Sequence, residues 1–221
     1  MTAFRITVTS DTVCPWCYVG RRQLQRAQKL WQQKYPDNKD SFLVTYAPYQ
    51  LNPDAPAQSR DKQQFYLDKF GPERTAMMHK RLSAVGDQLG IHFKFGGKTG
   101  NTRDSHRLVQ LAKRFGNDVE LKTVDGLFAA YFEEERDITD HETLRAIAVA
   151  AGIPASNFQE AIVDGDEGGS EVDEAVQSAR LNGVSGVPDY VIQGRYRING
   201  GQDASVFVQV FEKIGELEKK Q

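Results

Sequence analysis

The chain contains two cysteines, and both lie in the segment TVCPWCYVGRRQL, as Cys14 and Cys17. A helical pattern follows them, so we expect Cys14 at a helix N-terminus, where unpaired backbone N–H groups and the helix dipole favour a thiolate. Such a thiolate can attack a disulfide, and a second cysteine one turn along can resolve the mixed disulfide. Pro15 suits a first helical turn, and Trp16 offers a substrate an apolar surface. The spacing therefore indicates redox chemistry.

Three other uses of a Cys-x-x-Cys pair have less support in the sequence. A structural zinc site needs four ligands, and the chain has no further cysteine and no paired-histidine motif among His79, His92, His106 and His141. We therefore expect no metal. A c-type haem needs a histidine after the second cysteine, where this chain has Tyr18. The third alternative is a pair of inert, buried thiols.

Strand and helix patterns at the two ends of the chain indicate one α/β unit. Residues 4–9 alternate apolar and polar side chains, which predicts a strand. A helix is expected from residue 16 to about residue 35, and a second strand within 41–51 completes a β-α-β unit. Near the other end, Gln193-Gly194 predicts a hairpin turn between two short strands. A closing helix is expected over 203–220.

The stretch between these ends has helical patterns. A polar, proline-bearing segment, NPDAPAQSRDK, marks a boundary, and from about residue 61 to residue 182 we expect helices and no strand. The expected organisation is an α/β domain whose first part covers 1–58, an all-helical insertion over 59–183, and a second part of the α/β domain over 184–221. Without the insertion the order is β-α-β followed by β-β-α, with both chain ends contributing to one sheet.

Composition narrows the classes of partner. The formal net charge of the 221 residues is −2, so nothing points to nucleic acid or to an anionic membrane surface. Hydrophobic residues make up 39% of the chain, enough for a sizeable core, yet no apolar run reaches the length of a membrane span. No basic and apolar leader precedes the first predicted strand. We therefore expect a cytoplasmic protein with no nucleic-acid or membrane partner.

Several segments together resemble the DsbA-like thioredoxin-fold family, and within it the FrnE-type subgroup. They are CPWC after a first strand, NTRDSHRL over 101–108, GVSGVPDYVI around Pro188, and INGGQDASVF near the end. Ser105 stands where this subgroup usually has alanine, and Asn199 and Gly201 also depart from its pattern. The resemblance spans nearly the whole chain. It implies an α/β thioredoxin fold interrupted by a long all-helical insertion.

The resemblance also implies a set of site residues. It makes Cys14 and Cys17 the catalytic pair, and it implies a cis Val187–Pro188 bond beside Cys14, where the Val187 backbone pairs with a bound peptide or glutathione. By itself, Pro188 equally fits a proline that heads an edge strand. The substrate-binding residues it implies are Pro15, Trp16, Val187, Pro188, Asn101, His106 and Gln202. Because Trp16 supplies no cationic ring, we expect a less oxidising couple than that of the periplasmic Pro-His enzymes.

Asn101 and His106 have ordinary structural roles as well. Asn101 or Thr102, followed by Asp104, is a typical helix N-cap with a favourable acidic residue in the first turn. His106 either faces the cleft at Cys14, where it could transfer a proton or bind an acidic group, or packs as an ordinary helix residue. The sequence leaves both alternatives open.

Three functions are consistent with these observations. The first is a thiol–disulfide oxidoreductase that acts on protein or small-molecule thiols and disulfides, with no cofactor and with glutathione as a co-substrate. The second is a glutathione-dependent transferase or isomerase of the kappa-class or hydroxychromene-carboxylate type, although those relatives carry serine where this chain has Cys14. The third is a non-catalytic binding or chaperone module. The sequence leaves the oligomeric state open, a homodimer included.

Overall fold

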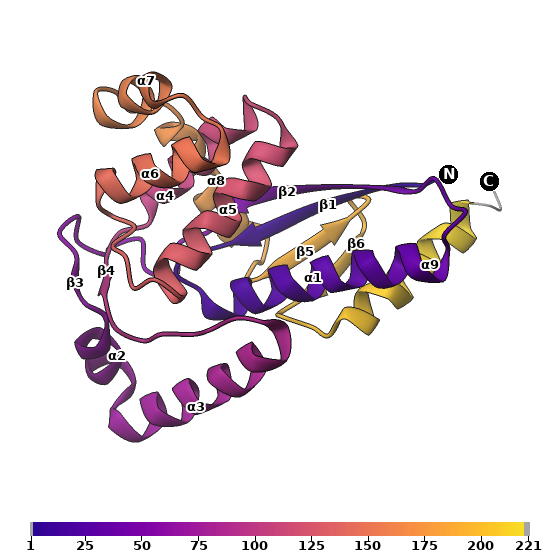
Figure 1. Cartoon of the computed structure of the whole chain (residues 1–221), viewed down its shortest axis with the longest axis horizontal. Coiled ribbons are helices and arrows are strands. Elements are labelled where there is room, and N and C mark those ends of the chain that lie inside the picture. Colours follow the sequence, from indigo (N-terminus) through magenta and orange to yellow (C-terminus); the bar gives the residue numbers. More distant parts are fainter. Residues whose placement is uncertain (1, 219–221) are drawn as a thin grey trace.

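The structure is a computed structural model that describes residues 2–218. Within these residues the main sheet has four strands in the order β2-β1-β5-β6 (Figure 1). β1 pairs in parallel with β2 and antiparallel with β5, and β5 pairs antiparallel with β6. The two ends of the chain therefore meet at β1, as expected. The strands are β1 (Ala3–Ser10), β2 (Ser41–Pro48), β5 (Asp189–Ile192) and β6 (Tyr196–Asn199).

Two helices, α1 (Pro15–Lys34) and α9 (Ala204–Glu218), lie together on one face of this sheet (Figure 1). Alternation along β1 decides which side chains they cover, because successive residues of a strand point to opposite faces. Phe4, Ile6 and Val8 are buried, whereas the intervening Arg5 and Thr7 are exposed. Of the helix predicted over 203–220, positions 219 and 220 lie outside the described residues.

The predicted hairpin turn is confirmed. Gln193 and Gly194 both have positive φ, 54° and 64°, as the central residues of a type I′ turn do, and the Arg195 N–H donates to the Ile192 carbonyl at 3.1 Å. Because Ile192 pairs with Tyr196, the loop between the strands has three residues. The second predicted strand is confirmed as β2 but ends earlier than expected, at residue 48. Tyr49 still donates its N–H to the Ser10 carbonyl, and Leu51 then donates to the Asp11 carboxylate, which draws the chain away from the sheet.

The residues between β2 and β5 are mainly helical, as expected, but they also include a short two-stranded ladder. β3 (Arg60–Asp61) pairs with β4 (Lys98–Thr99). Strands of two residues are too short to leave an alternating pattern in a sequence. No helix within 2–218 has the length and apolar character needed to cross a membrane. The helices are α2 (Lys62–Phe70), α3 (Pro72–Leu89), α4 (Arg103–Lys113), α5 (Asn117–Phe132), α6 (His141–Ala151), α7 (Ala155–Phe158), the π-helix η1 (Gln159–Val163) and α8 (Gly169–Leu181).

Side chains from α4 and α5 bind the outer edge of β2. Asn117 donates its amide to the Val44 carbonyl at 2.7 Å, and the Glu120 carboxylate accepts the Tyr46 N–H at 2.6 Å. Lys113 donates to the Tyr46 carbonyl at 2.6 Å. An edge strand with free N–H and C=O groups can pair with other chains, and these contacts satisfy the central groups of this edge. They also fasten the helical stretch to the sheet.

Glu120 is a suitable residue for testing this attachment, because its side chain is only 2% exposed. We expect Glu120→Ala to lower the free energy of unfolding by about 2–3 kcal/mol, since the Tyr46 amide is left buried and unpaired. Urea denaturation measures the change. Glu174→Ala, on the exposed surface of α8, is the matched control and should change the free energy of unfolding by less than about 0.5 kcal/mol.

The same residue predicts a pH dependence. Burial raises the pKa of Glu120, so the folded chain disfavours its ionised form. The stability that the protonated form contributes is present at low pH and is lost as the pH rises through the raised pKa. Glu120→Gln is neutral throughout, so it should gain stability relative to the native chain between about pH 4 and about pH 7. A stability difference that does not change over this range would contradict the assignment.

Candidate active site

Cys14 and Cys17 lie at the start of α1 as free thiols, 3.4 Å apart. That separation is well beyond the sulfur–sulfur bond of about 2.05 Å, so the structure holds the dithiol form. Cys14 is the N-cap residue of α1, and its own N–H donates to the Asp11 carbonyl at 3.1 Å. Pro15 follows in the first turn, as predicted. The backbone therefore presents the first cysteine at the positive end of a 20-residue helix.

The two thiols have different surroundings. Cys17 is 2% exposed and is packed beneath Cys14 in the core. Burial raises the pKa of the Cys17 thiol well above its ordinary value, and hydrogen bonding and charge interaction with Cys14 raise it further. Cys14 is 4% exposed but lines an open cleft, and its thiol lies 3.6 Å from the Val187 carbonyl. Of the two thiols, only that of Cys14 belongs to the lining of the cleft.

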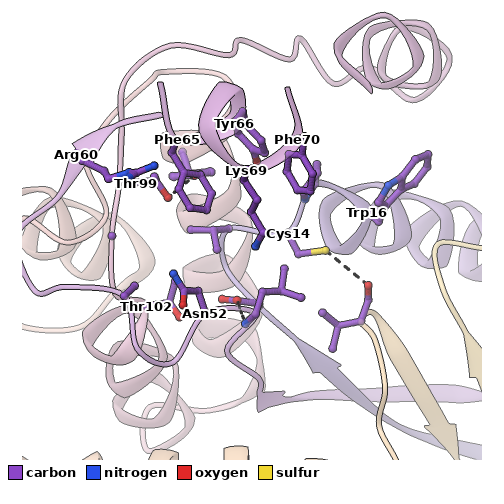
Figure 2. Close-up of a pocket in the computed structure, with 18 of the residues that line it drawn as sticks. Cys14, Trp16, Asn52, Arg60, Phe65, Tyr66, Lys69, Phe70, Thr99 and Thr102 are labelled. Atoms are coloured by element: carbon purple, nitrogen blue, oxygen red, sulfur yellow. Dashed lines mark hydrogen bonds between the residues drawn. The ribbon is translucent and has the colours of Figure 1, made fainter. Parts of the chain in front are cut away.

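The Val187–Pro188 peptide bond is cis, as the resemblance implied. The bond stands directly before β5, and the Val187 carbonyl accepts from the Cys14 thiol across the cleft (Figure 2). Pro188 itself is buried, whereas Val187 is half-buried and lines the cleft. Two residues separated by 173 positions in the sequence therefore lie next to each other on one side of the cleft.

Gly20, one turn after Cys17, allows β5 to approach α1. A Cβ at this position would overlap the Tyr190 hydroxyl and would lie 3.0 Å from Cγ of Pro188. The Tyr190 ring is fully buried, and within residues 2–218 its hydroxyl has no hydrogen-bond partner. Glycine is costly inside a helix, so its presence in α1 is explained by this close packing.

The cleft beside Cys14 has a volume of about 370 Å³ and lies between the sheet end and α2 (Figure 2). One side is formed by the cysteine loop and the Val187 segment, and the other by α2 with the β3–β4 ladder. Such a volume is typical of a small-molecule pocket. The lining residues are Asp11, Val13, Cys14, Pro15, Trp16, Leu51, Asn52, Ala55, Pro56, Arg60, Phe65, Tyr66, Lys69, Phe70, Met78, Thr99, Gly100, Thr102, Tyr131, Gly186 and Val187.

His106 is buried below this cleft and does not line it. Its Nε2 lies 2.9 Å from the Tyr49 carbonyl and 3.3 Å from Oδ1 of Asp11. Because a carbonyl only accepts, Nε2 carries a hydrogen. The other oxygen of Asp11 accepts the Leu51 N–H at 2.7 Å. His106 and Asp11 together hold the chain after β2 in position, and that chain forms the floor of the cleft.

Asn101 performs a similar structural task and also lies outside the cleft lining. Its amide donates to the carbonyls of Pro53 and Ala55, at 3.2 and 3.0 Å, and its carbonyl accepts from Gln50 and from the Arg103 N–H at the start of α4. One side chain therefore joins the cleft-forming loop to a helix terminus. The expectation that Asn101 binds substrate stays a prediction, as it does for His106.

Of the other residues predicted to bind substrate, some line the cleft and one lies outside it. Pro15 and Trp16 line the cleft, and the Arg81 guanidinium stands 4.9 Å from the Trp16 ring. Gln202 is exposed, outside the cleft lining, and donates to the Asn199 carbonyl at 2.8 Å. Ser105, the departure from the subgroup pattern, is buried with its hydroxyl 2.7 Å from that of Thr12, close to the cysteine loop.

Sequence reasoning missed the wall that α2 contributes. Phe65, Tyr66, Lys69 and Phe70 read as ordinary residues of an amphipathic helix, and only the density of aromatic residues in FYLDKF hints at a binding role. The buried Lys62 anchors this helix, because its ammonium donates to the Tyr131 carbonyl at 2.9 Å and stands 4.1 Å from the Tyr131 ring. Burial lowers the pKa of Lys62 to about 8.

Across residues 2–218 no group of three His, Cys, Asp or Glu side chains could hold a metal ion.

Comparisons with known proteins bear on the family and the fold of the chain. A family model described as the DSBA-like thioredoxin domain matches residues 5–212. The chain belongs to this family. The thioredoxin fold with a helical insertion, expected from the resemblance, is thereby confirmed.

Three proteins illustrate what the chain is similar to. A probable DsbA oxidoreductase from Streptomyces coelicolor is 27% identical, with a TM-score of 0.84 over 95% of this chain and 89% of the other. The uncharacterized protein YwbO of Bacillus subtilis is 26% identical over 160 residues, or 71% of this chain and 70% of YwbO. The cytosolic disulfide reductase DsbM from Pseudomonas aeruginosa, solved with GSH, shares the fold at 12% identity, with a TM-score of 0.61 over 98% of this chain and 100% of DsbM.

Packing at Gly20 yields a stability prediction. Gly20→Ala should lower the free energy of unfolding by about 1–3 kcal/mol, because the added methyl group forces β5 away from α1. Adding Tyr190→Phe should recover part of the loss, because it removes the hydroxyl oxygen that the new methyl group would overlap. Gly215→Ala in α9 is the control; its nearest neighbour, Trp31, lies 4.0 Å away, so this variant should gain up to about 1 kcal/mol. Thermal or urea unfolding of the four proteins gives the comparison, and a stable Gly20→Ala variant would rule out the constraint.

Proposed function

We propose that the chain is a thiol–disulfide oxidoreductase in which Cys14 is the nucleophile and Cys17 the resolving cysteine. The observation that carries the proposal is the asymmetry of the pair. Cys14 borders a 370 Å³ cleft beside the Val187 carbonyl, and Cys17 lies buried 3.4 Å away. A nucleophile must reach the substrate, whereas a resolving thiol needs only to reach the first sulfur.

The exchange follows from these positions. The Cys14 thiolate attacks one sulfur of a disulfide RSSR, the substrate S–S bond breaks, and RS⁻ leaves with the electron pair. Cys17 then loses its proton and attacks the Cys14 sulfur, which releases the second RS⁻ and forms the Cys14–Cys17 disulfide. One substrate disulfide is reduced by two electrons, and the dithiol is oxidised by the same two. The reverse sequence oxidises a substrate dithiol.

Glutathione is the co-substrate that we propose for returning the pair to the dithiol form. Members of the DSBA-like family act on thiols and disulfides, and one structural relative, DsbM, was solved with GSH. Two glutathione molecules would reduce the Cys14–Cys17 disulfide and leave as one glutathione disulfide. A cytoplasmic setting, with its reducing thiol pool, fits that direction of electron flow.

Trapping experiments test the roles of the two cysteines. After equilibration with glutathione and its disulfide, the native chain should contain an intramolecular Cys14–Cys17 disulfide, detected by mass after acid quenching and alkylation. Cys17→Ser should accumulate a mixed disulfide on Cys14, because the resolving thiol is absent. Cys14→Ser should take up no glutathione, because Cys17 is buried.

Two outcomes would count against this assignment. Glutathione bound to Cys17 in the Cys14→Ser variant would reverse the roles. A native chain whose cysteines never pair, and which still turns over a glutathione-dependent isomerisation as Cys14→Ser, would favour the transferase or isomerase alternative. The cysteine at position 14, where that class carries serine, argues for the oxidoreductase.

The resolution step should depend on pH. Burial raises the pKa of Cys17, and this cause persists once Cys14 is in a mixed disulfide and carries no charge. Cys17 is then protonated at neutral pH and must ionise before it attacks. We expect the rate of resolution to rise about tenfold per pH unit between about pH 7 and about pH 9. Rapid-mixing measurement of the second thiol released gives the rate, and a flat profile would disprove the dependence.

A further inference from the structure

The part of the cleft formed by α2 has an aromatic wall. Phe65, Tyr66 and Phe70 lie along one side, with ring centroids 5.6 Å apart for Phe65 and Tyr66 and 5.8 Å apart for Tyr66 and Phe70 (Figure 2). All three rings come from one helix, which the buried Lys62 anchors to α5. A fixed aromatic wall is suited to stacking against a planar, apolar group.

A positive charge lies within this wall. The Lys69 ammonium stands 5.4 Å from the Phe65 ring and 5.6 Å from the Phe70 ring, and its side chain extends toward Cys14 in Figure 2. Among residues 2–218 it has no hydrogen-bond or ion-pair partner within the distances that define one. Arg60, at the rim, is already paired with Asp68 at 3.1 Å. Lys69 is therefore the cleft cation that is available to a ligand.

The negative charge in the cleft lining is buried, whereas Lys69 is exposed to solvent. Within the described part of the chain, Asp11 is the one carboxylate that lines the cleft, and it is fully buried. Both of its oxygens are engaged, one by the Leu51 N–H and the other by His106. A cleft with an unpaired cation beside apolar walls attracts an anion and concentrates it near Cys14.

We infer that the cleft selects disulfides of small, anionic aromatic thiols, with Lys69 binding the acidic group and the aromatic wall of α2 stacking on the ring. The inference rests on the proposed oxidoreductase function and names its substrate class. A volume of about 370 Å³ accommodates one such aryl group beside Cys14 and is small for a folded protein loop. The aryl thiolate is the leaving group when Cys14 attacks, and the second thiol leaves when Cys17 resolves the mixed disulfide.

Four small disulfides separate charge from aromaticity. They are dithiobis(nitrobenzoate), which is anionic and aromatic; dithiodipyridine, neutral and aromatic; hydroxyethyl disulfide, neutral and aliphatic; and cystamine, cationic and aliphatic. The measurement is the second-order rate constant of the reduced protein with each disulfide. Every variant is compared with the native chain on the same disulfide, so the intrinsic reactivity of the reagent cancels.

Charge variants carry the main test. We expect Lys69→Gln to lower the rate constant for dithiobis(nitrobenzoate) about tenfold and to leave the two neutral disulfides unchanged. Lys69→Glu should lower it further and raise the rate constant for cystamine. Lys80→Gln removes the same charge from an exposed site on α3 outside the cleft and should change none of the four. Rising salt should slow dithiobis(nitrobenzoate), whose attraction to Lys69 it screens, should speed cystamine, whose repulsion it screens, and should leave the two neutral disulfides unchanged.

An aromatic variant tests the wall separately. Phe65→Leu keeps an apolar side chain and should lower the rate constants of both aromatic disulfides roughly fivefold while sparing hydroxyethyl disulfide. A denaturation curve like that of the native chain establishes that the variant is folded.

The outcomes distinguish this inference from the proposed function. Failure of the native chain to react with any disulfide would overturn both. Equal responses of Lys69→Gln to all four reagents would overturn the substrate class alone, because Lys69 would then act on Cys14 itself. If Lys69→Gln and Phe65→Leu slowed the reduction of insulin disulfides as much as that of dithiobis(nitrobenzoate), protein substrates would replace the small-molecule class and the oxidoreductase would stand.

Discussion

The pairing of β1 with β5 is the interaction on which the site depends. β1 leads directly into the cysteine loop, and β5 begins immediately after the cis Val187–Pro188 bond. The antiparallel register sets Thr9 opposite Asp189, so the carbonyl of Val187 comes to the end of the sheet where Cys14 stands. Because side chains alternate along a strand, a shift of one residue would turn Tyr190 away from α1 and move Val187 from the Cys14 sulfur.

Helix α1 gives the two cysteine side chains, Cys14 and Cys17, different surroundings. Its N-terminus carries Cys14 at the border of the cleft, and its next turn buries Cys17 in the core. Burial disfavours the Cys17 thiolate, so in the proposed exchange this thiol stays protonated until it attacks the mixed disulfide. The close approach of Tyr190 at Gly20 holds the helix against β5, so the distance between the cysteines and Val187 is set by packing in the core.

The helical residues inserted between β2 and β5 serve the sheet and the cleft at once. Asn117 and Glu120 on α5 satisfy the outer edge of β2, which fixes the helices relative to the strands. From that attachment, Lys62 ties α2 to α5 and brings an aromatic wall over Cys14. His106 and Asn101, which do not reach the cleft, position the loop that closes its floor. Stability and substrate access are therefore linked through the same few buried polar side chains.

The sequence by itself determined the local features of this protein. The Cys-x-x-Cys spacing at a helix start, the period-two pattern of β1 and the Gln193-Gly194 turn depend on neighbouring residues, so they could be predicted directly. The likeness of several segments to the DsbA-like family implied the cis bond at Pro188. Only the tertiary structure decided the contacts between segments that are distant in the sequence. The wall of the cleft on α2, the edge contact of Glu120 and the position of His106 beside Asp11 each bring together residues more than 50 positions apart. No periodicity in a single chain encodes such contacts, because they arise only when the helices pack on the sheet.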